Sequence, residues 1–339
     1  MIKTDLTPSG ITLFTLVNDN GMEVDLIELG ATIVSIRIPT KDGKKIDVVL
    51  GYDDLTKYRE NPCFFGSCVG PIANRTAGAQ FTIDGTVCKL PVNENKNNLH
   101  TDFDNGFHKR MFNPVIDFVK NRVCFTLKLE DGEYGLPGNR EFTVAYSLTE
   151  DNTLFLDYNM TTDKKTAINP TNHTYFNLGG HDSGLILDEE IKIMASCYTP
   201  VSNDLIPREL MPVTGTPFDF TTSKRIGKDI NADDNQLHIA GGYDHNFAIQ
   251  YSKEAVACVT DNTTGIKMEV FTDLPGMQFY TGNNIGTMVG KGDVIYKKNS
   301  GLCLETQYYP NSLNDERFDT PVINAGEEFV SRTGYHFIF

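Results

Sequence analysis

The chain has 339 residues, 30 of them basic and 45 acidic, which gives a formal net charge of −15 at pH 7. Nucleic acids and anionic membranes need clustered Lys and Arg, so this balance argues against both as partners and leaves a neutral ligand open. No apolar run approaches the roughly 18 residues of a membrane helix, and the first residues lack the apolar stretch of a signal peptide.

The seven cysteines are odd in number, widely spaced and without a Cys-x-x-Cys pair. Free thiols in a reducing compartment explain this pattern best. Two glycosylation sequons, at residues 74–76 and 172–174, coincide with candidate site segments that a glycan would block. We therefore expect a cytoplasmic protein.

Turns rich in Asn, Asp and Gly separate short β-branched and aromatic segments, which is the pattern of an antiparallel all-β protein. Residues 18–21 separate predicted strands at 12–17 and 22–28. Residues 41–44 do the same for 33–38 and 46–50. Both turns offer a glycine for a position with positive φ, so each pair predicts a hairpin.

The same device recurs further along the chain. Asp84-Gly85 predicts another turn. Lys120-Asn121 predicts a turn between strands at 115–119 and 123–129. Asp151-Asn152 does so between strands at 143–148 and 154–160. These segments predict a meander of antiparallel strands.

Helical patterns are scarce. Residues 53–59, which open with an acidic cap, and residues 223–230 are the candidates, and both are too short to build a βαβ unit. The proline-rich residues 199–222 predict an irregular excursion. With no linker and no repeat, we expect one domain over residues 1–339, a large antiparallel β-sandwich with a concave face for a ligand.

Polar groups gather in several segments. Asn74 and Arg75 end a run of small residues and could bind hydroxyls through several donors in fixed geometry, although Arg75 could equally be a surface arginine. His100 follows a polar turn, where a plain loop histidine is the alternative.

Residues 169–177 carry three Asn, two Thr and His173 across a predicted strand. Polar side chains at that density are costly in a core unless they bond each other or a ligand. Residues 241–247 bring Asp244 and His245 after a glycine pair. Both segments are therefore candidate parts of a ligand site.

Residues 301–307 read as a strand whose period of two puts Cys303, Glu305 and Gln307 on one face. Glu305 is a lone carboxylate in an apolar, β-forming run, and loss of water there moves its pKa up towards that of a general base. The alternative is a half-exposed structural glutamate.

A metal site could be assembled from His100, His173 and Asp244. These residues are far apart in the sequence and show no His-x-His or His-Glu-x-x-His spacing. We therefore expect no metal.

Six segments together resemble the aldose 1-epimerase (mutarotase) family, in family order: residues 74–75, 99–100, 169–178, 242–246, 274–283 and 303–307. The set is far more specific than any one of its members. The resemblance implies a large antiparallel β-sandwich, a hexose substrate in an open cleft, no cofactor, and interconversion of the α and β anomers of D-galactose or D-glucose.

The resemblance also implies roles. Glu305 matches the family's base, which acts on the C1 hydroxyl. His173 matches the acid, which protonates the ring oxygen, and His100 matches a histidine beside that acid. The positions that hold the sugar's hydroxyls match Asn74, Arg75, Asp244 and Gln278.

The chain departs from the family pattern at two places. Pro71 stands where members often have arginine, and Thr101-Asp102 stands where they often have glycines, so the loops around His100 could be shaped differently. Because the chain has no Trp, a stacking platform for the sugar must be Phe or Tyr, for instance Phe279 or Tyr308.

Anomer interconversion needs one base and one acid with pKa values near neutrality, which a desolvated Glu and a His supply. Three alternative functions stay open. The first is a glycosidase with Glu305 and Asp244 as paired carboxylates, and the second is a module that only binds sugar. The third is a hexose-phosphate 1-epimerase, which should line its cleft with extra Lys and Arg. The sequence does not decide whether galactose or glucose is the preferred substrate, or whether the protein is a monomer or a weak dimer.

Overall fold

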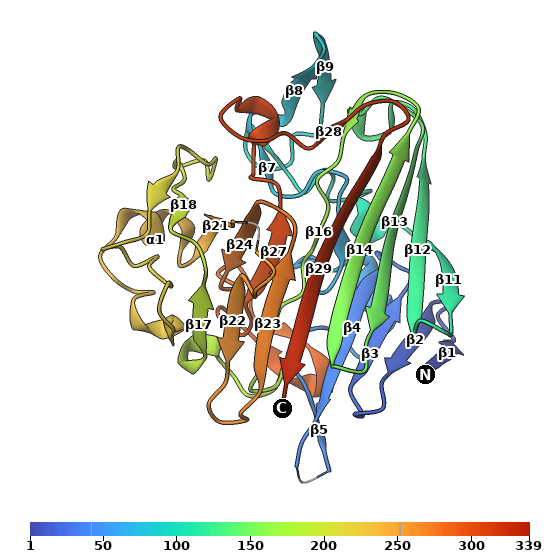
Figure 1. Cartoon of the computed structure of the whole chain (residues 1–339), viewed down its shortest axis with the longest axis vertical. Helices are drawn as coiled ribbons and strands as arrows, with labels where there is room; N and C mark the ends of the chain where they lie inside the picture. The colour runs from blue at the N-terminus through green and yellow to red at the C-terminus, as the bar shows by residue number, and fades with distance from the viewer. Residues whose placement is uncertain (42, 251) are drawn as a thin grey trace.

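Figure 1 shows a computed structural model of the chain, in which residues 1–41, 43–250 and 252–339 are described. The ladders that join its strands are antiparallel, and the described residues include one α-helix, α1 (Asn235–Ala240). The antiparallel all-β architecture predicted from the sequence is confirmed.

A nine-stranded sheet forms the front layer in Figure 1, in the order β11-β12-β13-β14-β29-β23-β22-β17-β20. In its strands alternate residues are buried, as β12 shows, because one face of the sheet lies on the core. The strands are β11 (Asn113–Asp117), β12 (Arg122–Leu129), β13 (Arg140–Leu148), β14 (Thr153–Thr162), β17 (Glu190–Ile193), β20 (Lys224–Arg225), β22 (Ala257–Thr260), β23 (Lys267–Thr272) and β29 (Glu328–Ile338).

Two five-stranded sheets pack against the large sheet. The first is a meander of β1 (Ile2–Leu6), β2 (Thr12–Val17), β3 (Glu23–Ile27), β4 (Thr32–Pro39) and β5 (Lys45–Asp47). The second runs in the order β19 (Met211–Pro212), β18 (Cys197–Thr199), β21 (Asp244–Ala248), β24 (Gly276–Tyr280) and β27 (Cys303–Gln307).

One hydrophobic core joins these sheets. Phe14 on β2 meets Phe125 on β12 edge to face, with ring centroids 5.5 Å apart. Tyr335 on β29 donates its hydroxyl to the carbonyl of Leu304 on β27 over 3.2 Å. The strand that carries Glu305 is therefore backed by the large sheet.

Short ladders and 3-10 helices complete the described chain. The remaining strands are β6 (Cys68–Val69), β7 (Arg75–Thr76), β8 (Gln80–Ile83), β9 (Thr86–Lys89), β10 (Asn98–Leu99), β15 (Thr166–Ala167), β16 (Thr171–Asn172), β25 (Met288–Val289), β26 (Ile295–Tyr296) and β28 (Val322–Ile323). The 3-10 helices are η1 (Leu55–Arg59), η2 (Ala77–Ala79), η3 (Phe107–Lys109), η4 (Glu133–Gly135), η5 (Ile186–Asp188), η6 (Ile226–Lys228), η7 (Lys291–Asp293) and η8 (Ser312–Asn314).

The predicted hairpins and the meander are present. The turn at residues 18–21 joins β2 to β3, and β11 to β14 follow one another in the large sheet. The predicted turn at 41–44 includes Asp42, which lies outside the described residues. The strand expected at 46–50 is the shorter β5, and the proline-rich segment is largely irregular, as predicted.

The helix predictions fare less well. The segment at 53–59 forms only the 3-10 helix η1, with the Asp54 carboxylate accepting from the Thr56 N–H at 2.9 Å. The helix predicted at 223–230 is wrong, because β20 and η6 occupy that segment. Helix α1 was not predicted, because its six residues are too few to show a helical period. No helix in the described chain is long and apolar enough to cross a bilayer.

Candidate active site

A cavity brings together six of the seven predicted site residues. Those six are Asn74, Arg75, His100, His173, Asp244 and Glu305. The other lining residues are mainly aromatic or apolar: Pro62, Cys63, Phe64, Leu99, Phe103, Tyr175, Tyr280 and Asn284. Gln278, the seventh, does not line it.

The register of three neighbouring strands determines which acidic side chains share one side of this cavity. Neighbouring strands β21, β24 and β27 pair so that Asn246 lies opposite Gln278, and Gln278 opposite Glu305. Because side chains alternate along a strand, Asp244, Gln278 and Glu305 all point to the same face of the sheet.

Glu305 is buried, with only 2% of its surface exposed, so the alternative of a half-exposed glutamate is excluded. Burial, followed by the charge of Asp244, raises the pKa of its carboxyl well above the ordinary value. Its Oε2 atom has no hydrogen-bond partner among the described residues. A buried carboxyl oxygen without a partner, beside a cavity, is suited to take a proton from a bound ligand.

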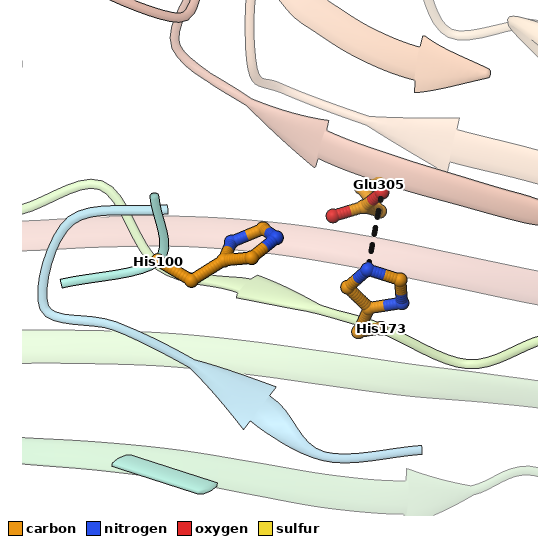
Figure 2. A group of neighbouring side chains, drawn as sticks. All are labelled: His100, His173 and Glu305. Atoms are coloured by element: carbon orange, nitrogen blue, oxygen red, sulfur yellow. Dashed lines mark ion pairs between the residues drawn. The ribbon is translucent and has the colours of Figure 1, made fainter. Parts of the chain in front are cut away.

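His173 directly follows β16 and faces Glu305, as Figure 2 shows, with Nε2 3.8 Å from Oε1. Its ring stacks on Tyr175 at 5.0 Å and on Phe64 at 5.8 Å. Burial lowers the pKa of His173 to about 4. Since burial disfavours both charges, it favours the neutral form of each group, in which the Glu305 carboxyl carries a proton and His173 carries a single ring hydrogen.

His100 is held in a left-handed backbone conformation, with φ of +54°, at the end of β10. The backbone N–H groups of Asn74 and His100 secure it: Asn74 donates to His100 Nδ1, and His100 donates to the Asn74 carbonyl, both over 3.1 Å. Burial keeps the pKa of His100 well below its usual value. The neutral ring therefore carries its hydrogen on Nε2, so this histidine is a hydrogen-bond donor.

The same tautomer decides whether a metal fits here. Ligand atoms of His100, His173 and Glu305 lie within 4.8 Å of one another. A neutral histidine binds a metal through one ring nitrogen while the other carries the hydrogen. In His100 Nδ1 accepts the Asn74 N–H, which leaves no lone pair for a metal on Nε2. These residues do not fit a metal as they are arranged.

Arg75 and Asp244 belong to a charged network at the cavity. The Arg75 guanidinium donates through Nε and Nη2 to Glu94, over 2.8 and 2.9 Å, and its Nη1 lies 3.6 Å from Asp244. Gln278 Nε2 donates to Asp244 over 2.7 Å, so Gln278 orients that carboxylate without lining the cavity itself. Burial raises the pKa of Asp244 against the effect of Arg75. No pattern in the sequence indicated Glu94, which lies between β9 and β10.

Thr101 shows how the chain accommodates one departure from the family pattern. It follows His100 in a second left-handed position, with φ of +66°, which a glycine would adopt more readily. Its hydroxyl accepts from the Ile72 N–H and donates to the Ile72 carbonyl, both over 2.8 Å. These bonds hold the loop that presents His100.

The two examples given for a stacking platform, Phe279 and Tyr308, are wrong. Phe279 is fully buried and stacks on Tyr243 at 5.3 Å, because alternation along β24 turns it away from the face that Gln278 occupies. Tyr308 does not line the cavity either. Aromatic lining comes instead from residues such as Phe64, whose ring lies 5.1 Å from that of His100.

The β-sandwich holds a buried carboxyl and two histidines together at one cavity, an arrangement typical of enzymes that transfer protons on a bound ligand. Similarity to known proteins identifies the family. The aldose 1-epimerase family model matches residues 12–336, and the chain belongs to this family.

Named relatives cover nearly the whole chain. Galactose mutarotase of Mus musculus is 40% identical over 337 residues, which are 97% of this chain and 96% of the relative. Aldose 1-epimerase of Escherichia coli K12 is 37% identical over 341 residues, 98% and 97% of the two chains. The crystal structure of galactose 1-epimerase from Lactobacillus acidophilus superposes with a TM-score of 0.86 at 29% identity, covering 100% of this chain and 99% of the other.

Proposed function

We propose that the protein interconverts the α and β anomers of an unphosphorylated aldohexose, D-galactose or D-glucose, by opening and reclosing the sugar ring. The observation that carries this proposal is the buried Glu305 carboxyl, whose Oε2 has no partner among the described residues and which lies 3.8 Å from His173 at a cavity. Membership of the aldose 1-epimerase family supports the same reaction.

The reaction uses the single proton that Glu305 and His173 hold between them. Transfer of this proton to His173 Nε2 leaves a carboxylate base and an imidazolium acid, and the charge of Arg75 favours the ionised carboxylate. Glu305 then takes the proton of the C1 hydroxyl, the C1=O1 double bond forms, the C1–O5 bond breaks, and O5 takes the proton from His173.

Reclosure reverses these steps. After rotation about C1–C2, His173 removes the proton from the O5 hydroxyl, O5 attacks the other face of C1, and Glu305 returns a proton to O1. Because the number of protons on the pair is unchanged over one cycle, no external acid or base is consumed. His100 donates through Nε2–H to an oxygen near C1 and keeps the ring in place between the two groups.

The remaining hydroxyls bind at the charged side of the cavity. Arg75, Asn74 and Asp244 line the cavity and offer donors and acceptors, and Gln278 orients Asp244. We propose this as the substrate-binding set, with Gln278 acting through Asp244.

The alternatives find less support. A phosphorylated sugar needs free cations, yet the single Lys or Arg of the described lining is Arg75, which two carboxylates already neutralise. A glycosidase needs a second carboxylate free to act at C1, whereas Asp244 is engaged by Arg75 and Gln278. A module that only binds sugar does not need a carboxyl and a histidine that can exchange a proton.

Polarimetry tests the proposal. Freshly dissolved α-D-galactose and α-D-glucose should reach their equilibrium rotation faster in proportion to added protein, and the ratio of kcat/KM values ranks the two sugars. If neither sugar equilibrates faster than in buffer alone, the proposed function is wrong.

We further propose that residues 1–339 form one domain and that the protein works in the cytoplasm. One core cluster that contains residues from Ile2 to Phe337 supports the single domain. Seven free cysteines support a reducing compartment.

A further inference from the structure

His245 follows Asp244 in the chain but has no contact with the cavity. Its side chain turns to the opposite face of β21, is fully buried, and packs against Phe218 and Tyr198 with ring centroids 4.5 and 5.8 Å away. A buried polar ring in an aromatic pocket is unfavourable unless its nitrogens are bonded.

Both ring nitrogens of His245 are in fact bonded. The backbone N–H of Asp244 donates to Nδ1 over 3.2 Å, so the hydrogen of the neutral ring is on Nε2, which donates to Gln236 Oε1 over 3.2 Å. Burial lowers the pKa of His245 to about 3, so this neutral tautomer persists throughout the working pH range.

Gln236, on α1, anchors this histidine to another part of the fold. Its Oε1 also accepts from the Val201 N–H over 2.6 Å, and its Nε2 donates to the Val201 carbonyl over 3.0 Å. The amide thus connects the start of the proline-rich segment to β21.

The position of Asp244 needs such an anchor. The chain enters β21 through Gly241 and Gly242, whose φ values of +69° and +140° are conformations that other residues rarely adopt. Gln278 and Arg75 fix the carboxylate end of Asp244, whereas His245 bonds its backbone N–H.

We propose that His245, supported by Gln236, is a positioning residue that fixes the Asp244 carboxylate for binding of the sugar's hydroxyls. This inference rests on the proposed function, in which Asp244 binds substrate. Neither residue touches the sugar, and neither takes part in proton transfer at C1 or O5. Their loss should therefore weaken binding in the ground state and the transition state alike, which raises KM and leaves kcat unchanged.

Three variants test this. His245→Leu and Gln236→Leu remove the bonds between the two side chains. His238→Ala is the matched control, because His238 lies on the same helix with its side chain 62% exposed. We expect both leucine variants to raise KM and the calorimetric Kd for galactose about tenfold, with kcat within about twofold. His238→Ala should stay close to wild type.

A double variant with Asp244→Ala tests whether His245 acts through Asp244. If His245 acts through Asp244, His245→Leu should add little to the KM of Asp244→Ala, although it adds about tenfold in the wild-type background. A lower kcat at unchanged KM, equal effects of Gln236→Leu and His238→Ala, or full additivity with Asp244→Ala would overturn the proposal.

The binding measurement separates the two proposals. If the wild-type protein binds galactose without mutarotating it, the proposed function fails, and the shift of Kd in the leucine variants still decides whether His245 positions Asp244. Unchanged Kd in a leucine variant with a wild-type melting curve contradicts the positioning role whatever the activity.

Discussion

Two buried glutamates in this molecule share almost every property except their surroundings. Glu305 and Glu189 are 2% and 3% exposed, and each has an Oε2 atom without a hydrogen-bond partner among the described residues. Burial raises the pKa of both, to about 8 for Glu189. By burial and pKa alone, either could be a general base.

Their neighbours differ. Glu189 precedes β17 and accepts from the Leu178 N–H over 2.7 Å, a bond that ties two segments of the chain together. It does not line the cavity, whereas Glu305 does and faces His173. The comparison teaches that a raised pKa becomes catalytic only where a ligand and a second proton carrier can reach the carboxyl.

The largest expected effect is at Glu305. Glu305→Gln keeps the shape of the side chain and removes its basicity, so kcat for mutarotation should fall by roughly 10²–10⁴ with sugar binding close to wild type. Polarimetry and calorimetry measure the two quantities. Normal turnover in this variant would make Glu305 as structural as Glu189.

His173→Asn should be the next most damaging change. Asparagine keeps some hydrogen-bonding reach but cannot deliver a proton, so we expect kcat to fall by roughly 10²–10³. Substitutions of His181 and His238, which lie outside the cavity lining, should do little. Similar losses at all three histidines would indicate a folding defect.

Glu189→Gln should leave kcat within about twofold of wild type and change stability instead. The folded pKa of Glu189 is raised from 4.5 to about 8, so its contribution to stability is fully present below pH 4.5 and is lost as the pH rises to 8. Gln cannot ionise, so the free energy of unfolding of the variant should not show this pH dependence. Relative to the wild type, the variant should become more stable as the pH rises from 5 to 8. Urea unfolding across that range measures it. A large loss of kcat would show that Glu189 is not the structural counterpart.

Removal of metal should have the smallest effect, namely none. Because His100 accepts the Asn74 N–H at Nδ1, the trio around Glu305 does not fit a metal, and prolonged dialysis against chelator should leave kcat unchanged. Activity that is lost on dialysis and restored by a divalent ion would contradict the tautomer assigned to His100.

Local patterns in the sequence predicted much of the fold. Alternation and turn chemistry predicted the hairpins, the meander and the strand face that Glu305 shares with Cys303 and Gln307, because these depend on neighbours in the chain. The same alternation, applied to β24, already implies that Phe279 points away from Gln278. The missed helix α1 is too short to show a period.

The parts that sequence could not predict depend on contacts between distant segments. Glu94 neutralises Arg75 from a loop 19 residues away, and Gln278 orients Asp244 instead of lining the cavity. Similarly, nothing local shows that Asn74 sets the tautomer of His100. Polar patterns in the sequence supplied most of the candidate residues, family resemblance added Gln278 and the roles, and packing decides what each residue touches.

One measurement tests the central claim, that Glu305 takes a proton from the anomeric hydroxyl, most directly. It compares galactose with a nitrophenyl galactoside, whose C1 oxygen carries an aryl group and has no proton to give. We predict rapid mutarotation of galactose and no release of nitrophenol, with the galactoside competing weakly for the cavity because its other hydroxyls are present. Release of nitrophenol that disappears in Glu305→Gln would contradict the account, since it would show Glu305 acting in glycoside cleavage.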